Sequence, residues 1–125
     1  MKYLRFIPAI SFATLIFYLS AQPNLRWVSE SERGIFGFSV DSAFLHLVIY
    51  AFFGMLIFFC FRNCNNNNFL LTVVLGSVYG VTDEIHQSFV PFRCCTIPDM
   101  IVNVFGVVVG ASLLLIIRLN QIDEK

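Results

Sequence analysis

Charged residues are scarce in this sequence. Asp, Glu, Lys and Arg make up 13% of its 125 residues, and eight basic side chains balance eight acidic ones. A chain without excess positive charge has no basic surface for nucleic acid and no polybasic segment for an anionic membrane surface. Nucleic acid is therefore excluded as a partner.

The spacing of the cysteines matches no metal motif. Of the four cysteines, Cys94 and Cys95 are adjacent, and neighbouring cysteines bridge each other only with strain. No two Cys-x-x-Cys pairs occur, as a zinc site of that kind would require. We therefore expect no metal and no cofactor, while the oxidation state of Cys94 and Cys95 stays open.

Apolar residues dominate instead, at 58% of the chain, which is too many for a soluble domain of this size. A helix needs about 20 residues to cross a membrane. Four runs reach or approach this length: Phe6–Leu19, Ala43–Phe61, Phe69–Phe89 and Met100–Ile117. The third run completes its span only by including Asp83, Glu84 and His86, which is the first indication of a functional site.

The prediction is an all-α membrane protein, a compact bundle of four transmembrane helices in one domain, 1–125. The expected helices cover residues 4–21, 42–61, 69–89 and 99–118. The first run also has the outline of a cleaved signal peptide, but the bulky Leu19 three positions before the candidate cleavage site argues against cleavage after Ala21. We expect it to remain as a membrane helix.

The distribution of Lys and Arg predicts the orientation, because cytoplasmic loops carry the excess. Two alternating sets of segments carry five and three of these residues: Lys2, Arg5, Arg62, Arg118 and Lys125 against Arg26, Arg33 and Arg93. Both termini are therefore predicted to be cytoplasmic, in a multi-pass membrane protein. The loops around 22–40 and 90–98 would face outward.

Glycine and asparagine mark the packing and one turn. Gly76 and Gly80, and likewise Gly106 and Gly110, lie four residues apart, a spacing that lets helix backbones approach closely in lipid. Packing within one chain is the favoured use, and a homo-oligomer stays open as a partner. The run Asn65–Asn68 is predicted to be a tight, solvated turn between the second and third helices.

Polar residues fall into three groups that the topology brings to one end of the bundle. Asp41 is placed to cap the second helix, with His46 and the weaker candidate Tyr50 on one face. Near the end of the third helix, side chains spaced three and four apart share a face: Asp83, His86 and Gln87, with Glu84 alongside. The fourth helix opens with Pro98 and Asp99 and continues on the same face with Asn103.

An ionisable side chain that faces lipid costs about 3 kcal/mol or more, so these groups should turn inward and pair. Arg93 is the expected cationic partner of Asp83, Glu84 or Asp99, and its fork could equally hold a phosphate or carboxylate. Pro91 and Pro98 would shape the loop that carries it.

These motifs also resemble the VanZ-like family. The resemblance rests on Leu-Ser-Ala-Gln-Pro at 19–23, Asp-Ser-x-x-x-His-x-x-x-Tyr at 41–50, Asp-Glu-Ile-His-Gln-x-Phe-Val-Pro-x-Arg at 83–93, and Asp-x-x-x-Asn-x-x-Gly-x-x-x-Gly at 99–110. It covers nearly the whole chain. It implies a four-helix bacterial membrane protein, and it associates some members with low-level resistance to the glycopeptide teicoplanin by an undefined mechanism.

This sequence departs from the family pattern at two positions. Ser42 stands where the family usually has Lys, which removes a cation beside Asp41. Phe92 stands where the family has Gly, and this side chain would narrow the approach to Arg93.

The expected function is a polar site at the outer membrane face that engages an anionic lipid or cell-wall precursor. Its core is predicted to be Asp83, Glu84, His86, Arg93 and Asp99. Its supporting shell is predicted to be Asp41, His46, Gln87 and Asn103. Three alternatives remain: a purely structural polar network, an acid/base or metal-dependent enzyme on a lipid-linked substrate with Glu84 and His86 as its acid/base pair, and a proton relay or transporter.

Overall fold

The computed structural model describes residues 3–23, 40–91, 93 and 95–123, and these contain four α-helices and no strand. A short 3₁₀ helix, η1 (Tyr3–Phe6), leads into α1 (Ile7–Ser20). The others are α2 (Val40–Cys60), α3 (Asn66–Gln87) and α4 (Ile97–Asp123). The predicted all-α, four-helix class is confirmed.

Three of the described helical segments are long and apolar enough to cross a membrane: Tyr3–Ser20, Ser42–Cys60 and Ile97–Gln121. Helix α3 has 22 residues, but its asparagine-rich start and its acidic end lower its hydropathy. Large apolar side chains on all four helices are exposed, among them Phe17, Phe52, Val78 and Phe105. Such a surface is suited to a lipid bilayer rather than to water.

The start of α3 differs from the predicted turn. Only Asn65 stays outside the helix, where its side chain accepts a 2.8 Å hydrogen bond from the Asn68 backbone N–H and caps the first turn. The amide of Asn68 in turn donates to the Asn63 carbonyl at 2.9 Å. The turn prediction for Asn65–Asn68 is therefore wrong, because these local bonds fold most of the run into the helix.

The start of α2 also differs from the prediction. The helix begins at Val40, so Asp41 lies inside its first turn rather than at the capping position. The described part of the structure does not include the side chain of Asp41, residues 24–39 of the predicted loop 22–40, Phe92 or Cys94.

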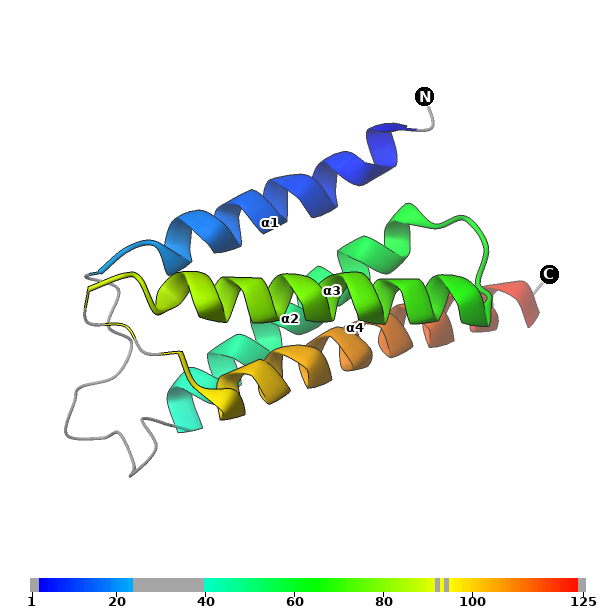
Figure 1. The fold of residues 1–125 in the computed structure, drawn as a ribbon. Coiled ribbons are helices and arrows are strands. Elements are labelled where there is room, and N and C mark those ends of the chain that lie inside the picture. The colour runs from blue at the N-terminus through cyan, green and yellow to red at the C-terminus, as the bar shows by residue number, and fades with distance from the viewer. Residues whose placement is uncertain (1–2, 24–39, 92, 94, 124–125) are drawn as a thin grey trace.

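The helices run alternately up and down (Figure 1), so the last residues of α1 and α3 and the first residues of α2 and α4 lie at one end. We call this the polar end. Helices α2 and α4 pack most closely, α3 packs against both, and α1 packs on α2 and α3. Within the described residues α1 does not contact α4. The first and last residues of the described chain both lie at the opposite end of the bundle (Figure 1).

Glycines permit this close packing. A Cβ at Gly110 would collide with the carbonyl oxygen of Ala51 on α2, and one at Gly54 with that of Val107 on α4. Gly80 on α3 lies against Asn103 and Tyr50. Both predicted glycine pairs are thus used inside the chain.

At the end opposite the polar end, Arg118 of α4 holds the end of α2. Its guanidinium donates to the carbonyls of Phe61 at 2.7 Å and Phe59 at 3.3 Å, and lies 5.5 Å from the ring centre of Phe58. A cation at a helix C-terminus satisfies carbonyls that lack partners within the helix.

Candidate functional site

The last turns of α3 send polar side chains toward three neighbours. Successive residues of a helix are rotated by about 100°, so Asp83, Gln87 and Glu84 lie within roughly a quarter of the helix circumference. His86 lies on the other side of Asp83. The structure accordingly directs Asp83 toward α2, Glu84 toward α4 and His86 toward α1.

Asp83 lies at the centre of a chain of hydrogen bonds. Its Oδ2 accepts from the Tyr50 hydroxyl and from the Gln87 amide, each at 3.0 Å. The Oε1 of Gln87 then accepts from Arg93 at 3.4 Å, and Arg93 also donates to the Leu19 carbonyl of α1 at 3.4 Å. Gln87 therefore links Arg93 to Asp83, which is one of the three carboxylates predicted as partners of Arg93.

A second chain joins α2, α4 and α3. Nδ1 of His46 lies 2.9 Å from Oδ1 of Asn103 and 3.6 Å from Oε1 of Glu84. The Asn103 amide nitrogen donates to the same Glu84 oxygen at 3.4 Å. Asn103 and Glu84 are fully buried. His46, Glu84 and Asn103, which the sequence analysis placed in three different groups, are thus in contact with one another.

Asp99 serves the start of α4. Its Oδ2 accepts from the Thr96 hydroxyl at 2.5 Å, and its backbone N–H donates to the same hydroxyl at 3.2 Å. This is a variant of the capping box, and the Thr-x-x-Asp pattern before an apolar run is the signal that could have revealed Thr96, which the sequence reasoning missed.

His86 lies apart from these chains. Its ring stacks on Phe17 of α1 with centroids 4.3 Å apart, and its Nε2 is buried without a hydrogen-bond partner among the described residues. The structure therefore separates His86 from Asp83 and Gln87, with which it was predicted to share a face.

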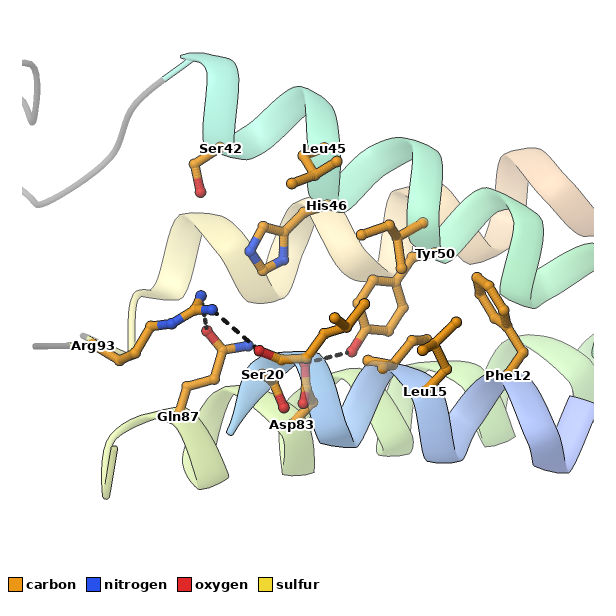
Figure 2. A pocket seen from close by; sticks show the side chains of 13 residues that line it. Phe12, Leu15, Ser20, Ser42, Leu45, His46, Tyr50, Asp83, Gln87 and Arg93 are labelled. Carbon is orange, nitrogen blue, oxygen red and sulfur yellow. Dashed lines mark hydrogen bonds between the residues drawn. The ribbon is translucent and has the colours of Figure 1, made fainter. Parts of the chain in front are cut away.

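A pocket of about 150 Å³ lies at the polar end between α1, α2 and α3 (Figure 2). One side is polar, formed by Ser20, Ser42, His46, Tyr50, Asp83, Gln87 and Arg93. The other side is apolar, formed by Phe12, Leu15, Ile16 and Leu19 of α1 with Leu45 and Ile49 of α2. The sequence reasoning ranked Tyr50 low, yet it is 1% exposed and holds Asp83.

Several buried oxygens in this region have no partner within the described part of the chain: Oδ1 of Asp83, Oε2 of Glu84 and Oδ1 of Asp99. A structural polar network stabilises a fold when every member is satisfied. Hydrogen bonds among the described residues therefore leave part of the acceptor capacity of these carboxylates unused.

The described residues hold no group of three or more His, Cys, Asp or Glu side chains arranged to ligate a metal ion. The metal-dependent form of the enzyme alternative thus gains no support from this part of the chain.

A helical membrane bundle with a polar network and an amphipathic pocket at one end defines the class of protein. Comparison with known families identifies it further: the model of the VanZ/LLP1 family matches residues 3–118, and the chain belongs to this family. The VanZ-like resemblance is confirmed. Neither the curated proteins nor the solved structures contain a significant match.

Proposed function

We propose that this protein is a multi-pass bacterial plasma-membrane protein that binds the anionic head group of an envelope lipid or cell-wall precursor. The observation that carries the proposal is the pocket in Figure 2, where Arg93 stands on the polar side and α1 and α2 supply an apolar wall. A guanidinium binds phosphate or carboxylate through paired hydrogen bonds, and an apolar wall accepts the adjoining chain.

The size of the pocket limits what enters it. A cavity of about 150 Å³ holds a group as large as benzene. The pocket therefore takes one anionic group with the first carbons attached to it, and the rest of the ligand lies in the bilayer.

The predicted orientation places this pocket in the outer leaflet, where lipid-linked wall precursors are used. We further propose that the protein contributes to teicoplanin resistance, on the basis of the family resemblance. It is tested by expressing wild type and Arg93→Gln, matched for membrane abundance, in a glycopeptide-sensitive host. Protection by wild type alone supports it, and equal susceptibility with and without the protein removes it.

The binding proposal is tested by native mass spectrometry of protein in phosphatidylcholine nanodiscs that contain either phosphatidylglycerol or a polyprenyl phosphate. We expect Arg93→Gln to lower the affinity for the retained lipid about tenfold or more, because a hydrogen bond to a charged group contributes about 1.5–3 kcal/mol. Arg62→Gln is the matched control, since Arg62 is exposed and lies in the loop between α2 and α3.

Equal retention of both anionic lipids and phosphatidylcholine by wild type would contradict the proposal. Loss of folded protein in every variant of Asp83, Gln87 and Arg93 would favour the structural network instead.

A further inference from the structure

The histidine in the pocket is held in one tautomer. Both groups that face Nδ1 of His46 are acceptors: Oδ1 of Asn103 at 2.9 Å and Oε1 of Glu84 at 3.6 Å. The Asn103 amide nitrogen donates to Glu84, which fixes the amide with its oxygen toward the imidazole. A neutral His46 therefore carries its proton on Nδ1, and its lone pair is on Nε2.

Because Nδ1 is engaged by Asn103, Nε2 is the ring nitrogen available to a molecule bound in the pocket. His46 lines the pocket together with Arg93, its side chain is 15% exposed, and its ring points into the space between α2 and α3 (Figure 2). An imidazole whose Nδ1–H is held by an acceptor, with Nε2 toward a ligand, is the arrangement of a general base.

We infer that the protein hydrolyses a lipid phosphoester, with His46 as the general base and Arg93 binding the phosphate. This inference rests on the proposed binding function and adds an activity to it. It also differs from the enzyme alternative based on Glu84 and His86, because His86 stacks on Phe17 and does not line the pocket.

The step is a hydrolysis. Nε2 of His46 takes a proton from a water molecule as the water oxygen bonds to phosphorus. The bond between phosphorus and one ester oxygen then breaks, and His46 returns the proton to the departing alcohol. The products are that alcohol and the phosphate that keeps the water oxygen. The guanidinium of Arg93 stabilises the charge on the phosphoryl oxygens.

The surroundings of His46 suit this cycle. Glu84 on α3 is the acidic group next to the imidazolium that forms, α4 contributes the neutral Asn103, and Tyr50 lies on the same helix with its ring 6.4 Å away. Arg93 and Asp83 face the same pocket. Asn103 and Glu84 are thus positioning residues, since they act through His46.

The inference is tested with purified protein in nanodiscs that contain phosphatidylglycerol, or separately a polyprenyl phosphate, with products followed by mass spectrometry. The two lipids distinguish a glycerophospholipid substrate from a polyprenyl one. We expect turnover of one of them by wild type and a fall of about 100-fold or more in His46→Asn. The asparagine amide keeps a donor near the position of Nδ1 but removes the base.

Two further variants separate chemistry from folding. Imidazole in solution should restore part of the turnover to His46→Ala. Glu84→Gln keeps an acceptor oxygen and should lower kcat with little change in KM, because only the imidazolium loses its counter-charge. Thr82→Ala is the control, since Thr82 is exposed and bonds only its own helix.

Retention of anionic lipid by wild type without any turnover would overturn this inference and leave the binding function intact. Full turnover in folded His46→Asn, or loss in His86→Gln but not in His46→Asn, would overturn it as well. Failure of wild type to retain either anionic lipid would instead overturn the proposed function itself.

Discussion

At the scale of single residues, the fully buried Tyr50 shows how the site depends on groups that look apolar in the sequence. Its hydroxyl is one of two donors to Oδ2 of Asp83, and the other is Gln87. Because Oδ1 has no partner in the described part of the structure, Asp83 depends on these two bonds. Removing either donor leaves a buried carboxylate under-satisfied.

We therefore predict that Tyr50→Phe lowers the free energy of unfolding by about 1–3 kcal/mol, the penalty for a buried polar group that loses its partner. SDS-induced unfolding in mixed micelles measures this change. The double variant Tyr50→Phe with Asp83→Leu should recover part of the loss, since the orphaned carboxylate is then absent. Equal stability of Tyr50→Phe and wild type would show that Asp83 does not need this donor.

Sequence reasoning located most of these residues but could not assign their partners. Asp83, His86 and Gln87 satisfy the same spacing rule, yet Gln87 lies about 40° to one side of Asp83 and His86 about 60° to the other. Only the placement of α1 and α2 decides that one enters the pocket and the other stacks on Phe17. Thr96 was missed because a hydroxyl just before a helix carries no charge to attract attention.

At the scale of helices, the glycines of α4 determine how near α2 can lie. At Gly110 the backbone of Ala51 leaves no room for a Cβ, and at Gly106 a Cβ would lie 2.8 Å from the Leu47 carbonyl oxygen. Backbone atoms cannot rotate away as a side chain does. The whole helix has to move to accept a methyl group at either position.

Gly110→Ala should accordingly destabilise the bundle by about 1–3 kcal/mol, as overpacking of a close contact does. Differential unfolding in SDS against wild type is the measurement. Leu113→Ala on the exposed side of the same helix serves as the control and should stay within about 0.5 kcal/mol. A Gly110→Ala protein as stable as wild type would mean that α2 and α4 are farther apart in the membrane.

The helices themselves could be predicted to different degrees. Long apolar runs predicted α1, α2 and α4, because a helix that crosses a bilayer needs about 20 mostly apolar residues. The start of α3 could not be predicted in this way, since it depends on the Asn65 cap rather than on apolar residues.

At the scale of the whole molecule, the orientation in the membrane can be tested with two cysteines. Cys95 is exposed and lies just before α4 at the polar end, and the partly exposed Cys64 lies between α2 and α3 at the other. The lysine and arginine distribution predicts that the polar end faces outward. The two thiols therefore report on opposite sides of the membrane.

In single-cysteine variants, a membrane-impermeant maleimide should label Cys95 in cells whose outer layers are removed, and Cys64 only after lysis. Partial desolvation and the carboxylates of Glu84 and Asp99 raise the pKa of Cys95, and the thiolate is the reactive form. Its labelling should therefore speed up as the pH rises above neutrality. Labelling of Cys64 alone in intact cells would reverse the orientation and place the pocket on the cytoplasmic side.

Helices α2 and α4 contact each other closely at three places along their length. The two helices are joined at the polar end by His46 and Asn103, in the middle by the glycine contacts, and at the far end by Arg118. We expect these two helices to move together as one rigid unit. Helix α1 is attached by separate bonds, from Tyr79 to the Ala13 carbonyl and from Arg93 to the Leu19 carbonyl. We therefore expect α1, rather than α2 or α4, to move when a ligand enters the pocket.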